Sequence, residues 1–385
     1  MTDKLFENDS YINEFEAKVL ECAEYKERYK IVLDKTAFFP EGGGQKADTG
    51  FLNGVKVIDV WEKDGTVYHE VSEKLEPGTV VKGEIDWLQR FYRMQNHSGE
   101  HLISGIIHAL YGYNNVGFHM GHDVVTLDVD GRISIGELKD VEERANEAIY
   151  ENVPIRAFVP DKSELEGMEI RSKIDLVEGI RIVEIEGYDR CACCAPHVAK
   201  TGEIGIVKIL NSYPNKGGTR IELLCGHDAL EYYRKKLSDN TEIMKLLSAP
   251  DGQTAEAVRK LLDSISAYKT EIRSLKDKLA LAKLKVQKIN SVAVGYLEDA
   301  DFDDLRVCIN QLTVGNDGIC AVFSGTENTD GCMYIVSSES SDIAKFMQHL
   351  KDTLNAKGGG KSNYSQGKVP ANFGEIIKAI ENYRV

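Results

Sequence analysis

The sequence predicts a protein of several α+β domains, and three observations lead to this fold class. A length of 385 residues exceeds what one hydrophobic core usually serves. The first part of the chain alternates polar and apolar residues, a middle part keeps helical spacing, and the last part mixes the two patterns. We therefore expect a small β-barrel over residues 1–90, an α+β domain over 91–226, a helical segment over 227–290 and an α/β domain over 291–385.

Short strands with period-two alternation predict the N-terminal barrel. The pattern occurs from Glu14 to Val19 and from Tyr29 to Leu33, and further strands are expected from Val55 to Trp61 and from Val80 to Ile85. A loop of this barrel contains three consecutive glycines, Gly42 to Gly44, whose missing β-carbons allow unusual backbone angles and a close approach to a ligand. No Gly-Lys-Ser/Thr sequence accompanies them, so the loop does not predict a phosphate-binding motif.

Two histidines stand four residues apart in a stretch where the pattern becomes helical, starting near Phe91. We expect His97 and His101 in the opening turns of this helix, with Asn96 or Ser98 as its N-cap, so that both rings project from one face. Such a pair taken alone is more often a surface or capping feature than a metal site. A stripe of apolar residues that follows would bury the helix against a sheet: Ile103, Ile106, Ile107 and Leu110.

A cluster of cysteines and a histidine lies almost a hundred residues later, at Cys191-Ala192-Cys193-Cys194-Ala195-Pro196-His197. Cys193 and His197 again stand four apart. Cys191 and Cys194 are alternatives for the sulfur ligand, and only the spacing to His197 favours Cys193. Imidazole nitrogens together with a thiolate suit Zn²⁺ in tetrahedral geometry. The two clusters together predict one zinc ion per chain, bound by four side chains: His97, His101, Cys193 and His197.

These motifs resemble, in order, those of the editing domain of alanyl-tRNA synthetase and of its freestanding relatives, the alanyl-tRNA editing proteins. His97 to Leu102 is similar to the first zinc motif, and Cys193 to Gly205 to the second. Phe38 to Gly50 resembles the family's glycine-rich loop, and Lys216 to Glu222 the strand after the second zinc motif. The chain departs from the family where two glycines and a threonine usually separate the second-motif Cys and His; here the residues are Cys194-Ala195-Pro196.

The resemblance implies a freestanding, long-form editing protein that hydrolyses the ester of mischarged tRNA(Ala) carrying serine or glycine. An alanine pocket cannot strongly exclude either amino acid, so a second site must hydrolyse those products. Since the predicted barrel begins close to Met1, we expect no aminoacylation domain. The resemblance also implies that Gln45, Gly43 and Gly44 contact the substrate or the developing oxyanion. The expected tRNA contacts are Lys216, Arg220, Lys357 and Lys361.

A helical segment follows the motifs, with one helix expected from Ala229 to Leu247 and a second from about Thr254 to Ile289. The second keeps apolar residues at alternating steps of three and four, which predicts a coiled-coil seam about 50 Å long. A helical hairpin within one chain is the alternative. The seam residues are Val258, Leu261, Ile265, Tyr268, Ile272, Leu275, Leu279, Ala282, Val286 and Ile289.

The last segment alternates strands and helices and then reaches Lys357-Gly358-Gly359-Gly360-Lys361, which we expect to be a loop before a final helix from Phe373 to Asn382. This arrangement resembles the DHH-associated domain at the C-terminus of alanyl-tRNA synthetase. The resemblance implies that the domain binds tRNA or mediates dimerisation. A homodimer through the helical segment and this domain is therefore expected.

Two other functions are consistent with parts of the sequence. His97-Ser98-Gly99-Glu100-His101 also satisfies the H-x-x-E-H pattern of zinc peptidases, in which Glu100 would be the general base. That hypothesis leaves the Cys193 to His197 cluster and the triple glycine unexplained. The other alternative is a non-catalytic tRNA-binding protein whose zinc is structural. His119 and His122 have no ligand partner at helical spacing and are expected not to bind metal.

Composition and charge limit the choice of partner and compartment. A formal charge of −15 opposes bulk attraction to nucleic acid, so tRNA binding would need a local basic patch. We predict no signal peptide and no transmembrane helix, and the eight cysteines do not suggest a disulfide framework. A cytoplasmic protein without a membrane partner is expected. The basic residues near the motifs that could form the patch are Lys35, Lys46, Arg90, Arg93, Lys208, Lys216 and Arg220.

Overall fold

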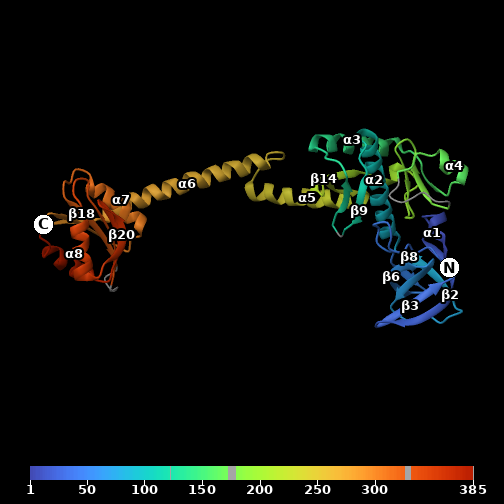
Figure 1. The fold of residues 1–385 in the computed structure, drawn as a ribbon, viewed down its shortest axis with the longest axis horizontal. Coiled ribbons are helices and arrows are strands. Elements are labelled where there is room, and N and C mark those ends of the chain that lie inside the picture. Colours follow the sequence, from blue (N-terminus) through green and yellow to red (C-terminus); the bar gives the residue numbers. More distant parts are fainter. Residues whose placement is uncertain (122, 172–178, 326–330, 385) are drawn as a thin grey trace. The chain divides into compact units, whose positions relative to one another are not determined.

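The structure is a computed structural model that describes residues 1–121, 123–171, 179–325 and 331–384 (Figure 1). It confirms the mixed α+β class. The chain divides into two compact units, Met1–Glu242 and Ile243–Val385. No helix in the described ranges combines the length and the apolar character that crossing a membrane requires.

Six antiparallel strands form a closed barrel at the start of the first unit, in the order β2-β3-β7-β6-β5-β8 (blue in Figure 1). Alternating side chains fill its interior, and Val19, Ile31 and Leu33 are completely buried there. The same part of the chain also contains the helix α1 and two short strands, β1 and β4, which pair in parallel. The bounds are β1 (Asp3–Lys4), α1 (Leu5–Asn8), β2 (Glu14–Tyr25), β3 (Arg28–Leu33), β4 (Lys35–Thr36), β5 (Gly50–Leu52), β6 (Val55–Lys63), β7 (Thr66–Val71) and β8 (Val80–Ile85).

The rest of the first unit is built around the helix α2 (Trp87–Tyr111), which packs on α3, β13 and β15. One sheet has the order β14-β15-β10-β9 and a second has the order β11-β12-β13. The bounds are β9 (Asn115–Met120), β10 (Val125–Val129), α3 (Ile135–Glu151), β11 (Ile155–Phe158), α4 (Lys162–Gly167), β12 (Ile182–Ile185), β13 (Asp189–Ala192), η1 (Thr201–Ile204), β14 (Val207–Asn215), β15 (Gly218–Cys225) and α5 (Gly226–Leu247).

Helix α2 begins earlier than the sequence predicted, and this corrects the proposed caps. Asp86 is the N-cap, because its side chain accepts a hydrogen bond from Gln89 N. Asn96 and Ser98 therefore lie inside the helix. The two histidines consequently lie in the middle of a buried helix, held by turns on both sides.

The second unit contains a six-stranded sheet in the order β16-β17-β18-β19-β21-β20. Two clusters of buried apolar residues lie in this unit, one of them including Phe323, Tyr334 and Phe346 and the other Leu305 and Ile309. The bounds are α6 (Thr254–Lys283), β16 (Lys285–Ile289), β17 (Val292–Glu298), α7 (Phe302–Thr313), β18 (Ile319–Gly325), β19 (Cys332–Ser337), α8 (Ala344–Leu354), β20 (Lys357–Lys361), β21 (Tyr364–Val369) and α9 (Phe373–Glu381).

Two elements of the second unit differ from the prediction. The long helix was expected to continue to Ile289, but α6 ends at Lys283 and the next residues form β16, since pairing with β17 satisfies their backbone groups. Val286 and Ile289 therefore do not belong to a helical seam. The glycine-rich stretch was expected to be a loop, but it is the edge strand β20. Glycine suits it, because a β-carbon at Gly358 would lie 2.3 Å from the carbonyl oxygen of Gln366.

Candidate functional site

His97 and His101 occupy one face of α2, one helical turn apart, and are almost completely buried, with 2% and 3% of their surface exposed. The small residue between them allows close packing, since a β-carbon at Gly99 would lie 2.2 Å from Cys225 Sγ. The helix therefore presents both imidazoles inward at a site closed by neighbouring strands.

Cys193 and His197 lie in the segment that follows β13. Arg181 holds this segment, because its Nη1 donates to the carbonyl oxygens of Cys193 at 2.9 Å and Ala195 at 3.0 Å. Val198 N donates to Ser98 Oγ at 3.2 Å, which joins the segment to α2. These bonds bring two distant parts of the sequence together.

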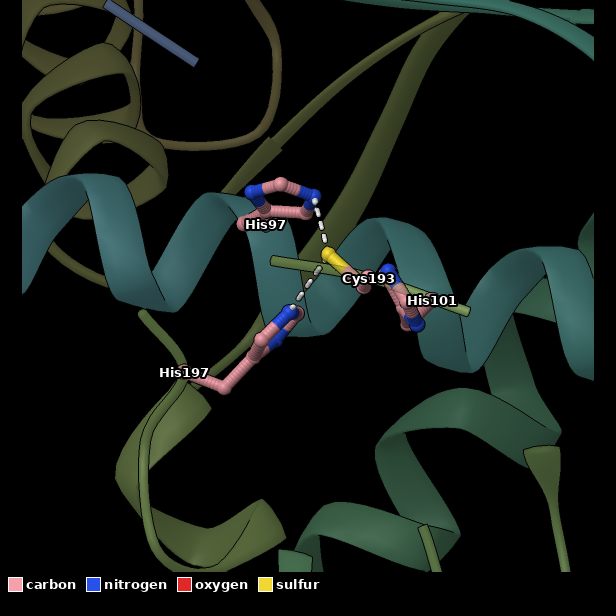
Figure 2. Close-up of side chains that lie close together, drawn as sticks. All are labelled: His97, His101, Cys193 and His197. Atoms are coloured by element: carbon pink, nitrogen blue, oxygen red, sulfur yellow. Dashed lines mark hydrogen bonds between the residues drawn. The ribbon is translucent and has the colours of Figure 1, made fainter. Parts of the chain in front are cut away.

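The four predicted ligands converge on one point (Figure 2). Cys193 Sγ lies 3.4 Å from His197 Nε2 and 3.7 Å from His97 Nε2. One potential ligand atom from each of His97, His101, Cys193 and His197 lies within 4.8 Å of the others, so the group could hold a metal ion. Among the three cysteines of the motif, Cys193 is the one in this group. Cys191 belongs instead to a neighbouring group with His101 and Asp189, and Cys194 is exposed.

Each histidine has a partner at its outer ring nitrogen. Gln45 Oε1 lies 2.8 Å from His97 Nδ1, and Ser98 Oγ lies 3.0 Å from His197 Nδ1. Asp189 Oδ2 lies 3.2 Å from His101 Nδ1, within ion-pair range. Partners at Nδ1 orient the rings with Nε2 towards the centre, as second contacts of metal-bound histidines do.

The electrostatics favour a thiolate at the centre. Burial alone would raise the pKa of the Cys193 thiol, but His97 and His197 beside it bring that pKa well below its usual value. Burial alone would lower the pKa of His101, yet Asp189 and Cys193 raise it well above its usual value. Burial lowers the pKa of His197 to about 3, so this ring stays neutral. The raised pKa keeps a proton on His101 beside the thiolate, and a metal ion that binds at the cluster would displace this proton, because imidazole binds metal in its neutral form.

The cluster forms part of the wall of a cavity of about 540 Å³. Apolar and polar side chains line it, among them Phe118 and Arg171. Asp189 accepts both hydrogen bonds of a bidentate pair with Arg171, at 3.0 and 2.9 Å. The described lining residues are Gly43, His97, Glu100, His101, Asn114, Asn115, Val116, Phe118, Arg171, Ile180, Arg181, Cys191, Ala192, Cys193 and Cys194.

The glycine-rich loop reaches this site from the barrel side. Gly42 and Gln45 pair across a tight turn, in which Gly43 and Gly44 have φ of 58° and 84°. Glycine is required at position 44, because a β-carbon there would lie 2.6 Å from Phe118. Gly43 lines the cavity, whereas Gln45 is completely buried and turned towards His97.

The predicted basic residues differ in their surroundings. Arg90 is completely buried, Lys208 pairs with Glu142, and Arg220 forms a bidentate pair with Asp128 at 2.6 Å for both bonds. Arg93 Nη1 donates to the carbonyl oxygen of Ala47. The prediction that Arg90 could belong to a phosphate-binding patch is wrong, because its guanidinium is bound to a buried carboxylate and to carbonyl oxygens. The predicted contacts Lys216, Lys357 and Lys361 are exposed.

Two of the remaining histidines were expected not to be ligands. His119 lies on β9 with an exposed side chain and belongs to neither group of potential metal ligands in the described ranges. His122 lies outside the described residues.

Sequence reasoning missed the residues that hold the ligands. Ser98, Asp189, Arg171 and Arg181 were not selected for this role, although Ser98 lies inside the first motif and Asp189 lies two residues before Cys191. Asp189 could have been predicted from chemistry, since a histidine that binds a metal usually donates its other ring N–H to a carboxylate or a carbonyl oxygen, and Asp189 is the carboxylate nearest in sequence to Cys191. Arg181 has no such signal, because it binds backbone oxygens.

Comparison with known proteins gives two matches to protein families. Residues 180–222 match the threonyl and alanyl tRNA synthetase second additional domain. Residues 8–89 match the class II (A) tRNA synthetases. The first match includes the cysteine and histidine of the second motif, and the second includes the glycine-rich loop.

Relatives cover nearly the whole chain. The alanyl-tRNA editing protein AlaX-L of Pyrococcus horikoshii is 28% identical, over 100% of this chain and 99% of its own length. The alanine–tRNA ligase of Methanococcus maripaludis is 32% identical over 98% of this chain but only 43% of its own length. The alanyl-tRNA editing protein Aarsd1-B of Xenopus laevis is 30% identical, over 89% of this chain and 84% of its own length. Because this identity extends over most of both chains, the protein belongs to the alanyl-tRNA editing protein family.

Proposed function

We propose that this chain is an aminoacyl-tRNA deacylase that removes serine or glycine from mischarged tRNA(Ala). The observation that carries the proposal is the cluster of His97, His101, Cys193 and His197, of which all but His197 line a cavity, in a chain of the alanyl-tRNA editing protein family. The relatives named as editing proteins match over most of their length, so the resemblance is not limited to one motif.

We infer that the cluster binds one Zn²⁺ ion per chain. Three imidazoles and a thiolate are a donor set that zinc prefers, and their partners at Nδ1 orient the rings for it. When bound, the ion supplies Lewis-acid polarisation close to the ester. His97 is oriented by Gln45, His197 by Ser98 and His101 by Asp189, so these three residues keep the site in one arrangement.

The position of the glycine-rich loop at the cavity supports a role for it in holding the substrate. Gly43 lines the cavity, and apart from Gly43 itself and its two chain neighbours no described residue has an atom within 4 Å of the place where its β-carbon would be. The space above it is therefore open to the aminoacyl group or the terminal ribose. Gly44 keeps the loop against Phe118, while Gln45 acts on His97. We assign Gly43 to substrate contact, and Gln45 and Gly44 to the support of the site.

For tRNA binding, we propose contacts outside the cavity. Lys216 is exposed at the turn between β14 and β15, and Lys357 and Lys361 are exposed at the two ends of the edge strand β20. Arg220 could contact a phosphate only while its guanidinium also pairs with Asp128.

For the domain boundaries, we keep the proposed segments 1–90, 91–226, 227–290 and 291–385. The division between the two compact units, after Glu242, falls inside the third of these segments.

Deacylation of Ser-tRNA(Ala), Gly-tRNA(Ala) and Ala-tRNA(Ala), measured in parallel, tests the proposal. We expect fast loss of serine or glycine, slow loss of alanine, and no activity in His97→Ala, because this variant loses one side chain of the cluster. Lys288→Ala, an exposed residue of β16, is the matched control and should retain activity. Tight binding of tRNA without hydrolysis of any ester would instead support a non-catalytic binding protein.

The peptidase alternative is less well supported. It assigns Glu100 as general base but leaves Cys193 without a role, although the sulfur of Cys193 lies among the histidines. Failure of the deacylation assay together with cleavage of peptides would restore this alternative.

We also propose that the chain forms a homodimer through α6. Apolar side chains at steps of three and four are exposed along this helix, including Leu261, Ile272 and Leu275 at 47%, 55% and 55%. Such a stripe is typical of a coiled-coil seam. Replacing both Ile272 and Leu275 by glutamate should convert a dimer to a monomer in sedimentation equilibrium. Lys276→Glu is the control, and a monomeric unaltered protein would contradict the proposal.

A further inference from the structure

One carboxylate lines the cavity directly beside the metal-ligand cluster. Glu100 precedes His101 on α2 and is only 2% exposed. Its Oε1 accepts a hydrogen bond from Asn115 Nδ2 at 2.6 Å and another from Ser104 Oγ. Both donors approach Oε1, so Oε2 is the oxygen through which Glu100 can accept a bond from a molecule in the cavity.

The other charged groups around this cavity do not favour a cationic ligand. Among the described lining residues, Glu100 is the single carboxylate, whereas Arg171 and Arg181 both carry positive charge. Arg171 is paired with Asp189, and Arg181 is bound to backbone carbonyl oxygens. Cys193 also lines the cavity, but its sulfur lies against His97 and His197, so a positively charged group that enters the cavity would find its carboxylate counter-charge at Glu100.

The substrate of the proposed reaction carries such a group. An aminoacyl ester has a free α-amine, which is separated from the ester carbonyl by a single carbon atom. A carbonyl at the metal-ligand cluster thus places the amine in the same cavity. In an N-acylated ester, as in peptidyl-tRNA, the amine is replaced by a neutral amide. A buried carboxylate binds a cation much more strongly than it binds a neutral donor.

We propose that Glu100 binds the α-ammonium group of the aminoacyl ester and thereby makes the site specific for unblocked aminoacyl groups. This inference rests on the proposed deacylase function. Glu100 is then a specificity-determining residue, held in place by Asn115 from β9 and by Ser104 one turn further along α2. Without its charge, the cavity would accept the free and the N-blocked ester almost equally.

The test compares unaltered protein with Glu100→Gln. Glutamine keeps the shape and an oxygen that can accept from Ser104 and Asn115, but removes the charge. Deacylation rates are measured for Ser-tRNA(Ala) and N-acetyl-Ser-tRNA(Ala). Calorimetry gives the Kd of the 3′-seryl-amide of adenosine, an analogue that is not an ester, with its α-amine free or acetylated. We expect the unaltered protein to prefer the free amine by roughly 10- to 100-fold in both measurements.

In Glu100→Gln the preference should fall to nearly one. Ser104→Ala is the matched control, because it removes one hydrogen bond to the same oxygen and leaves the charge, so the preference should persist. An unaltered protein that deacylates normally but shows no preference for the free amine would overturn the assignment of Glu100 alone. If Glu100→Gln keeps the full preference for the free amine, the assignment of Glu100 is overturned as well. An unaltered protein that neither hydrolyses the esters nor binds either analogue overturns both this inference and the proposed function.

Discussion

Replacing Cys193 by serine is expected to lower the metal affinity of this protein by about 100-fold or more and to abolish deacylation. The sulfur lies 3.4 Å from His197 Nε2 and 3.7 Å from His97 Nε2, so its loss removes the anionic member of the cluster. Loss of an outer partner already costs roughly 10- to 100-fold in metal affinity, and a direct ligand contributes at least as much. Metal analysis of the purified proteins should show one zinc per chain before the substitution and little after it.

Cys194→Ser and Cys191→Ser serve as the matched controls for metal content. Cys194 is exposed and lies outside both groups of potential ligands among the described residues, so its variant should keep the metal. Cys191 groups with His101 and Asp189 rather than with all three histidines. If Cys191→Ser lost the metal and Cys193→Ser retained it, the assignment of the sulfur ligand would be wrong.

The second large effect is expected from Arg90→Met. Arg90 is 0% exposed, and its guanidinium donates to Asp48 and to the carbonyl oxygens of Ser10 and Ala37. Methionine fills much of the space but removes the guanidinium that is hydrogen-bonded to the Asp48 carboxylate, which is 1% exposed and keeps only Arg93, at 3.9 Å, as a positive neighbour. Removing one partner of a buried ion pair costs about 3–5 kcal/mol. The free energy of unfolding of the first unit should fall by this amount.

Urea unfolding followed by tryptophan fluorescence measures this change, because both tryptophans, Trp61 and Trp87, lie in the first unit. Arg93→Met is the control, since its side chain is 17% exposed and lies 3.9 Å from Asp48. The double variant Arg90→Met, Asp48→Asn should recover part of the loss, because no uncompensated charge remains. A loss below about 1 kcal/mol in Arg90→Met would contradict the role given to this pair.

The sequence identified the four side chains that come together in the cluster better than it identified the residues that surround them. His97 and His101, and likewise Cys193 and His197, have spacings that depend only on local geometry, so the pairs are visible in the sequence. Their meeting point depends on tertiary contacts. Arg181 binds backbone oxygens of the Cys193 segment, and backbone contacts leave no trace in residue type.

The long helix shows the opposite limitation, in which a local pattern was overruled. Val286 and Ile289 continue the apolar steps of α6, so periodicity alone extends the helix through them. Both residues are β-branched and also fit a strand, and the partner strand β17 follows directly after the turn at Asn290. Sheet pairing decided between two patterns that the sequence permits equally.

The extent of α2 has a consequence for how this protein can be recombined with others. A crossover placed after residue 90, where the barrel was predicted to end, would cut the helix after its first four residues. It would leave Arg90 with Asp48 but would separate Arg93 from Asp48 and Ala47, and His97 from Gln45. The barrel and the helix that carries His97 and His101 should therefore be exchanged together when a chimaera is built.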